Sequence, residues 1–222
     1  TFYATFLGGP SFSWSPDSKW ITYASDTERG SNIYLVNVET GKSMQVARAA
    51  RGASNPRFLP NGKAIFYNTD EFDTTEVMIV DLVEPEVTFT EDDLDQIDVE
   101  KPKPGPVAVE VQERNLMRRV RRLTNGGANA LLASPDSRSI WAMVDGQLSA
   151  IPVSGGAAQP VAAVTGPVRA MALAANGSKV YLQQMGGRLS ALNLQGGQVA
   201  PINYSARMQV NRKAEEMELF YE

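Results

Sequence analysis

Short stretches in which apolar and polar residues alternate recur along the chain, and each follows a turn built on Pro-Asp or a close variant. In the first unit Phe12-Ser13-Trp14 leads into the turn, and the alternating stretches 20–24 and 32–38 follow it. Alternation with a period of two is typical of half-buried β-strands, and Gly-containing gaps between such stretches are typical of hairpin turns. The pattern therefore predicts antiparallel strands joined by tight turns.

The same unit occurs four times. Counted at the Asp or Asn of the turn, 44 residues separate Asp17 from Asn61, 75 separate Asn61 from Asp136, and 40 separate Asp136 from Asn176. A period of about 40–45 residues is the size of one four-stranded propeller blade. The middle interval is one period plus an insertion. We therefore expect an all-β fold, a β-propeller of four-stranded antiparallel blades that occupies residues 1–205 and is part of a larger ring.

The turn residues recur in every unit, and this recurrence decides how they are interpreted. Pro fixes φ near −65°, and an Asp or Asn side chain can accept a hydrogen bond from the backbone two residues further on. Asp17, Asp136 and Lys63 are candidates for catalytic groups when each is taken alone. Because the same chemistry returns in each unit, we interpret them as turn residues.

The chain has no histidine and no cysteine. A Ser-His-Asp triad, a His-based metal site and a disulfide therefore have no place within it. Ser134, Ser149 and Ser190 are the serines considered as nucleophiles, but none has a His or Cys partner, which favours an ordinary structural role. We predict no catalytic, cofactor-binding or metal-binding residue.

An acidic, Pro-rich insertion is expected at 84–106. Eight of the 17 residues from Glu84 to Glu100 are acidic. Calcium ligation is one interpretation, but the spacing lacks the central Gly and terminal Glu of an EF-hand loop. A solvated excursion is favoured, and the alternation at 107–111 predicts a strand directly after it. The four carboxylates considered for calcium are Asp92, Asp93, Asp95 and Asp98.

A cluster of five arginines follows at residues 114–122. Binding to nucleic acid is the functional interpretation, but no aromatic residue is interleaved to stack a base, and Val120 and Leu123 interrupt the run as core-facing residues would. The formal net charge of −4 gives no further reason to expect nucleic acid, and no apolar run approaches the length of a membrane span. We expect neither nucleic acid nor a membrane as a partner.

The two ends of the chain differ from the repeats. Residues 1–6 are expected to be a strand left over from a preceding blade, after a processed or engineered start without Met. In the tail, Val210, Ala214, Met217 and Tyr221 follow a helical spacing. Residues 206–222 are therefore expected to begin a helical segment leading to another domain, and a C-terminal capping helix is the alternative.

The repeats resemble the WD40-like Pro-Asp repeats of TolB and of tricorn-type proteases. Residues 109–124 resemble the tricorn segment that opens a propeller blade, and residues 207–222 resemble the tricorn junction between propeller and protease core. The match departs at Glu216, where that family often carries Trp. The resemblance implies a non-catalytic propeller region of a cytoplasmic, tricorn-like serine peptidase, acting as scaffold and peptide channel. No position matches the family's catalytic motifs, so no catalytic residue is carried over.

Two other functions remain open on the sequence. One is a TolB-like propeller that binds partner proteins on one face, and the other is an independent enzyme that uses the central cavity. The missing histidines argue against the enzyme. The expected partners are peptides, the protease core domain, and further copies of the chain that pair with open blade edges. A location outside the cytoplasm is equally compatible with the absence of cysteine.

Overall fold

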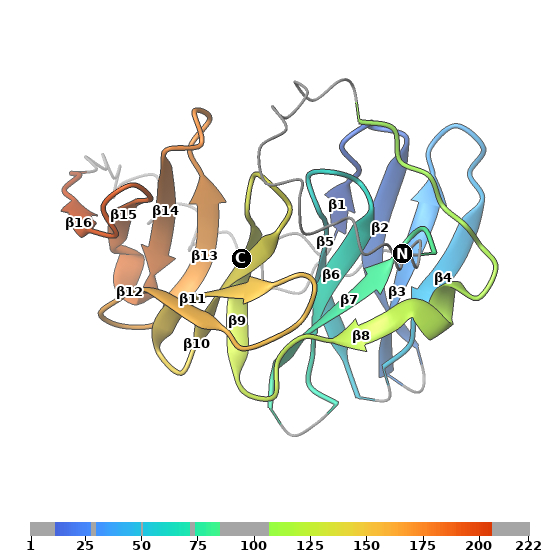
Figure 1. The fold of residues 1–222 in the computed structure, drawn as a ribbon, viewed down its shortest axis with the longest axis horizontal. Coiled ribbons are helices and arrows are strands. Elements are labelled where there is room, and N and C mark those ends of the chain that lie inside the picture. The colour runs from blue at the N-terminus through green and yellow to red at the C-terminus, as the bar shows by residue number, and fades with distance from the viewer. Residues whose placement is uncertain (1–11, 28–29, 50, 72–73, 85–106, 206–222) are drawn as a thin grey trace, which may run out of the picture.

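Four antiparallel sheets of four strands each make up the structure. The computed structural model describes residues 12–27, 30–49, 51–71, 74–84 and 107–205. Each sheet is a meander of strands consecutive in the chain, and Figure 1 shows the four sheets side by side, from the first at the right to the last at the left. We call them blades 1 to 4. The predicted propeller architecture of four-stranded antiparallel blades is confirmed.

The strands of each blade pair in chain order. Blade 1 consists of β1 (Phe12–Trp14), β2 (Trp20–Thr27), β3 (Gly30–Asn37) and β4 (Ser43–Ala47). Blade 2 consists of β5 (Ala53–Phe58), β6 (Ala64–Thr69), β7 (Glu76–Asp81) and β8 (Val120–Arg122). Blade 3 consists of β9 (Ala128–Ala133), β10 (Ser139–Val144), β11 (Gln147–Pro152) and β12 (Gln159–Ala163). Blade 4 consists of β13 (Val168–Leu173), β14 (Lys179–Gln184), β15 (Leu189–Asn193) and β16 (Val199–Ile202), and two short 3-10 helices are η2 (Leu116–Arg119) and η3 (Met185–Gly187).

The first two strands of every blade are joined by a Pro-Asp turn or its variant. We call the end of the blades that carries these turns the turn face. An antiparallel meander places the connection between its third and fourth strands at the same end. The connection between the second and third strands, and the link to the next blade, lie at the opposite end, which we call the loop face.

The hydrophobic core lies between neighbouring blades. One cluster joins blades 1 and 2 around Leu35, Ile65 and Tyr67, a second joins blades 2 and 3 around Phe66 and Ile140, and a third joins blades 3 and 4. Both faces of the central blades are covered, so all six residues of β6 are buried. Burial on both faces explains why these strands are rich in apolar residues at successive positions.

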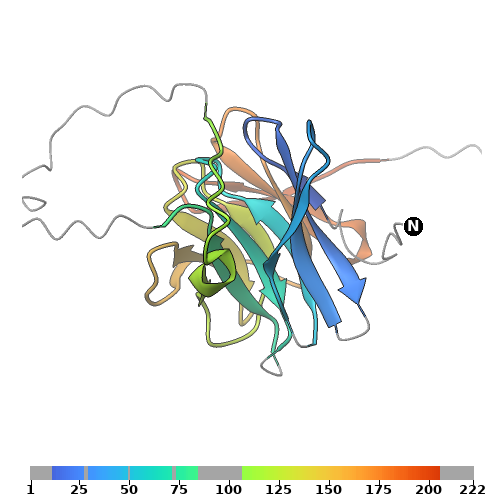
Figure 2. The ribbon, with the colours of Figure 1, turned by 90° about the vertical axis from the view of Figure 1, so that its right-hand side faces the viewer.

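The prediction of a strand at residues 107–111 is wrong. These residues form no strand, and the fourth strand of blade 2 is β8, nine residues further on. The insertion thus interrupts blade 2 between β7 and β8. Because β6 and β8 occupy the two edges of β7, no edge remains there for residues 107–111. They cross the turn face instead, visible in green beside η2 in Figure 2, which views the array from the blade 1 end. We call residues 107–113 the strap.

Several expectations concern segments outside the described residues. They are the strand at 1–6, the carboxylates between Asp92 and Asp98, and the helical segment at 206–222.

Candidate binding surfaces

The four Pro-Asp turns share one set of hydrogen bonds. In blade 1 the N–H of Ser18 donates to the carbonyl of Ser15 at 3.0 Å, and Asp17 Oδ1 accepts the N–H of Lys19 at 3.1 Å. The equivalent side-chain bond joins Asn61 to Lys63, Asp136 to Arg138 and Asn176 to Ser178. Ser18 and Ser137 take the left-handed conformation with φ of 59°, and Gly62 and Gly177 take it with φ of 69° and 68°. The interpretation of Asp17, Asp136 and Lys63 as turn residues agrees with this geometry.

The two turn aspartates have lowered pKa values. Burial raises the pKa of Asp17, but hydrogen bonds from Ser15 Oγ and from the N–H groups of Val109 and Lys19 outweigh it, and the pKa falls below its ordinary value. The pKa of Asp136 is lowered in the same way by Ser134 and Arg138, against the effect of burial. Both carboxylates are therefore stabilised in the ionised form, which suits an acceptor and not a general acid.

The strap joins the turns of the first two blades. The N–H of Val109 donates to Asp17 Oδ2 at 2.9 Å, and the Val109 side chain packs directly over Gly62. The strap continues with a bond of 2.9 Å from the N–H of Gln112 to the carbonyl of Leu82. Lys42 Nζ lies 2.6 Å from Glu113 Oε1, although both side chains are exposed and the pair contributes little. The return of the insertion is thus fixed across blades 1 and 2.

The three candidate serines have structural positions. Ser134 Oγ lies 2.6 Å from Asp136 Oδ1 and accepts the N–H of Ser139 at 3.0 Å, as Ser15 does in blade 1. Ser149 is buried inside blade 3. Ser190 donates to Gln184 Oε1 at 3.1 Å. The carboxylate that Ser134 contacts is that of the turn residue Asp136, and Ser15 and Asp17 form the same bond in blade 1.

The arginine cluster is largely tied to the fold. Arg121 forms a two-pronged ion pair with Asp81, at 2.9 and 3.2 Å, and also donates to the carbonyl of Val153 in blade 3. Arg122 pairs with the buried Glu76, and Arg119 donates to the carbonyls of Gln112 and Arg114. Leu123 is buried, as predicted. These arginines hold β8 and the strap in place and do not form a free basic surface.

A hollow of about 620 Å³ lies on the turn face between blades 2 and 3. It is lined by charged residues that include Lys63, Glu84, Glu110 and the Asp81–Arg121 pair. Because Arg121 is already neutralised by Asp81, the hollow offers no strong excess of one charge. It is therefore a weak candidate for the recognition of a charged ligand.

A second hollow, of about 640 Å³, lies on the loop face and spans blades 2, 3 and 4. We call it the loop-face cleft. Apolar lining comes from Met143, Val164 and Val168, and polar lining comes from Thr74, Thr75, Asn129 and Asp145. Asn129 and Val168 belong to β9 and β13, the first strands of their blades, which lie innermost in a propeller. The cleft therefore borders the propeller axis.

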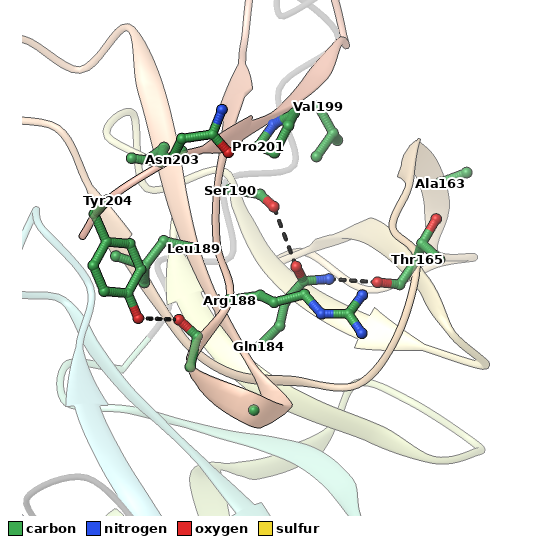
Figure 3. A pocket seen from close by; sticks show the side chains of 13 residues that line it. Ala163, Thr165, Gln184, Arg188, Leu189, Ser190, Val199, Pro201, Asn203 and Tyr204 are labelled. Atoms are coloured by element: carbon green, nitrogen blue, oxygen red, sulfur yellow. Dashed lines mark hydrogen bonds between the residues drawn. The ribbon is translucent and has the colours of Figure 1, made fainter. Parts of the chain in front are cut away.

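A third hollow, of about 620 Å³, lies at the junction of blades 3 and 4 (Figure 3). Its polar lining is mutually bonded: Gln184 accepts from Ser190 and donates to the carbonyl of Thr165, and Tyr204 Oη donates to the carbonyl of Gly187. Arg188 projects beside Gln184 in the close-up. These bonds fix the shape of the hollow and leave few of its polar groups for a ligand.

Sequence reasoning identified none of the three hollows. Each is formed by loops of different blades, and the residue spacing within one repeat does not predict which loops of different repeats lie together. Within the described parts of the chain, no group of three or more Asp and Glu side chains is placed to hold a metal ion. The same parts contain no helix long and apolar enough to cross a membrane.

Comparisons with known proteins show the fold and not a family. No family model matches the chain, and no curated protein does. Among solved structures, TolB from Acinetobacter baumannii is 16% identical with a TM-score of 0.60, covering 91% of this chain and 45% of TolB. The tricorn protease is 14% identical with a TM-score of 0.58, covering 89% of this chain and 22% of the protease. A nidogen/laminin complex is 11% identical with a TM-score of 0.58, covering 87% of this chain and 64% of the matched one.

This chain therefore spans less than two thirds of each of these structures. TolB and the tricorn protease are equally similar to it, and at these identities the likeness concerns the β-propeller architecture alone. The tricorn-like and TolB-like interpretations of the sequence remain two candidates.

Proposed function

We propose that this chain is a non-catalytic propeller region that binds peptides and serves as scaffold and channel wall of a tricorn-like serine peptidase. Its partners in this proposal are extended peptides and a protease core that supplies the catalytic residues. The observation that carries the proposal is the loop-face cleft, which borders the innermost strands β9 and β13. A chain that passes along the axis of a propeller would meet this cleft.

The lining of the cleft suits an extended peptide. Its apolar residues Met143 and Val168 can contact side chains, and the hydroxyl and amide groups of Thr75 and Asn129 can bond a peptide backbone. The candidate serines, in contrast, are engaged or buried. Binding without cleavage is the activity that such a surface supports.

The proposal is tested with a fluorescent peptide of about ten residues and mixed sequence, whose anisotropy is measured against increasing concentrations of the chain. We expect saturable binding and no cleavage of the peptide. Asn129→Arg places a long side chain in the cleft, and we expect it to weaken binding about tenfold or more. Gln195→Arg adds the same charge at an exposed position of the turn face and serves as the matched control.

Absence of saturable binding by the unchanged chain would contradict the proposal, and cleavage of the peptide would contradict its non-catalytic part. Equal weakening by both arginine variants would move the site away from the cleft.

A TolB-like propeller that binds folded partner proteins is the second candidate. The likeness to TolB, with its TM-score of 0.60, favours it as much as the tricorn likeness favours the first. The same titration separates the two, because a surface for folded partners has no need to bind a ten-residue peptide of mixed sequence.

A further inference from the structure

The three hollows differ in the charge of their linings. The turn-face hollow is lined by charged residues of both signs, and Arg188 is the charged residue at the junction of blades 3 and 4. Among the described residues that line the loop-face cleft, Asp145 is the one acidic or basic residue. The cleft to which we assign peptide binding is therefore negatively charged at a single place, and the rest of its lining is neutral.

Asp145 lies at the tip of a tight hairpin in blade 3. It and Gly146 join β10 to β11, whose last and first residues, Val144 and Gln147, are paired. Both turn residues have positive φ, 48° for Asp145 and 81° for Gly146, which is typical of a two-residue hairpin turn of type I′. The hairpin therefore fixes the point at the loop face from which the carboxylate extends.

The carboxylate of Asp145 has no partner among the described residues. Its side chain is exposed, and no hydrogen bond or ion pair reaches it from any described range of the chain. The turn aspartates differ, because Asp17 and Asp136 each accept hydrogen bonds from a serine hydroxyl and from a backbone N–H. Asp145 thus retains its full capacity to accept hydrogen bonds from a ligand.

The other charges near the cleft do not neutralise Asp145. Thr74 lines the cleft and donates to Glu76 Oε1 at 3.2 Å, and Glu76 pairs with Arg122. Arg169, on β13, is not part of the lining, and its Nε lies 3.0 Å from Met185 Sδ in blade 4. No basic side chain in the described lining therefore competes with a ligand for Asp145.

Apolar side chains lie in the same cleft as this carboxylate. Met143 precedes Asp145 by two residues on the same hairpin, and Val164 and Val168 line the cleft from the link between blades 3 and 4 and from the start of β13. A cation bound next to such a surface is less hydrated than one in open water. Its attraction to a carboxylate is therefore stronger than that of a fully exposed pair.

We propose that Asp145 makes the loop-face cleft selective for peptides that present a cationic group. The group is the N-terminal ammonium of the peptide or a basic side chain, since both donate charged hydrogen bonds to a carboxylate. This inference rests on the proposed function and adds a specificity to it. Binding of a peptide as such needs the hydroxyl, amide and apolar lining, whereas selection by charge needs Asp145.

The test uses four peptides of ten residues with a fluorophore at the C-terminus. Three have an acetylated N-terminus and differ at one central residue, which is Lys, Gln or Glu, and the fourth combines Gln with a free N-terminus. Anisotropy is measured against increasing concentrations of the 222-residue chain at pH 7 and low salt. We expect one or both cationic peptides to bind about fivefold more tightly than the acetylated Gln peptide, and the Glu peptide to bind more weakly than it. The peptide that gains more identifies the source of the cation.

Asp145→Asn removes the charge and keeps the turn, because Asn-Gly is a favoured pair in a type I′ turn. We expect this variant to bind all four peptides within about twofold of one another, the remaining difference coming from the net charge of the chain. Glu39→Gln removes a carboxylate at an exposed position of the turn face and is the matched control, which should keep the preference.

Two failures are distinguishable in this experiment. Equal binding of all four peptides by the unchanged chain, or a preference that persists in Asp145→Asn, overturns the inference and leaves peptide binding itself intact. Absence of binding by every peptide contradicts the proposed function and overturns the inference with it.

A chemical cross-link locates the cation independently of affinity. A water-soluble carbodiimide activates a carboxylate, and a peptide amine in contact with that carboxylate then forms an amide as the urea leaves. We expect mass spectrometry to find the peptide amine joined to Asp145 in the unchanged chain, and the yield to fall in Asp145→Asn. Amides formed mainly at the acidic residues between Glu84 and Glu100 would place the cation elsewhere and overturn the inference.

Discussion

At the scale of single residues, Asp or Asn occupies the same position in all four turns. Each side chain makes the same local hydrogen bond, but the other contacts of these side chains differ. All four side chains accept a backbone N–H two residues further on. Asp17 has an additional role, because its Oδ2 also accepts the N–H of Val109 in the strap. Comparison with the equivalent turns of the other blades therefore shows which contacts of a turn residue are additional to the turn itself.

Asp17→Asn tests this additional role. Asn61 and Asn176 show that Asn suits the turn, but at position 17 an amide N–H would face the N–H of Val109. We expect a loss of about 1–2 kcal/mol in the free energy of unfolding, measured by urea denaturation at neutral pH. Asp136→Asn is the control, and we expect it to cost about 0.5 kcal/mol because no strap contacts that turn. Equal losses would show that the strap bond contributes nothing.

The same variants have a predictable dependence on pH. A carboxylate whose pKa is lowered in the folded state stabilises the fold fully above its unfolded pKa, about 3.8, and this contribution is lost as pH falls through the lower folded value. The difference between the unchanged chain and Asp17→Asn should therefore shrink below pH 4. A difference that persists unchanged at the lowest pH at which the chain is folded would contradict the assignment.

Gly62 differs from the equivalent glycine of blade 4 in what surrounds it. Both have positive φ, and Ser occupies the same position in blades 1 and 3 with φ of 59°. A Cβ on Gly62 would lie 2.6 Å from Val109 Cγ2, whereas a Cβ on Gly177 would have nothing within 4 Å. We expect Gly177→Ser to cost about 1 kcal/mol and Gly62→Ser about 2 kcal/mol more, measured by thermal unfolding. Similar melting temperatures for the two variants would argue against a fixed strap.

At the scale of elements, the arginine cluster and the alternation at 107–111 show where sequence patterns mislead. Apolar and polar residues alternate in any extended segment that has one side covered. The turns of blades 1 and 2 cover one side of the strap, as the neighbouring layer of a sheet would, so the strap shows the alternation of a strand without being one. The clustered arginines appear basic in the sequence because their partners Glu76 and Asp81 lie about 40 residues away on β7. Only the pairing of β7 with β8 brings these charges together.

Replacement of Arg122 tests the structural role of the cluster. Its partner Glu76 is 1% exposed, so Arg122→Leu leaves a carboxylate buried without its counter-ion. We expect a loss of about 3 kcal/mol in the free energy of unfolding, measured by urea denaturation. Arg118→Leu removes an exposed arginine of the same cluster and should change stability by less than about 0.5 kcal/mol. Comparable losses for both variants would mean that the ion pair is not what stabilises β8.

Much of the fold can be predicted from the sequence because each blade repeats the same turn residues and the same alternation of apolar and polar residues. Turn chemistry and two-residue alternation act within about ten residues, so the turns and the second and third strands were predicted correctly. The fourth strand of blade 2 was not, because its partner strand precedes the long insertion. The loop-face cleft was not predicted either, since Thr75, Asn129 and Val168 come from three different blades. Contacts between repeats depend on packing angles that no single repeat encodes.

At the scale of the whole molecule, the structure is an open row of blades in which each core cluster joins two neighbours. Stability in such an array is the sum of the units and their interfaces. Among the described residues, blades 1 and 4 each share a core cluster with one blade, and blades 2 and 3 each share one with two. Trp14 in blade 1 and Tyr181 in blade 4 are 50% and 43% exposed.

The insertion within blade 2 has a consequence for the order in which the blade is completed. The other third-to-fourth strand connections span residues 38–42, 153–158 and 194–198, whereas that between β7 and β8 spans residues 82–119. Loop-closure entropy makes the longer connection cost about 2 kcal/mol more. β8 recovers this through only three residue pairs with β7 and the two ion pairs of Arg121 and Arg122. We therefore expect the outer strand of blade 2 to be the last to join its sheet during folding and the first to leave it, with Arg121 and Arg122 holding it against β7.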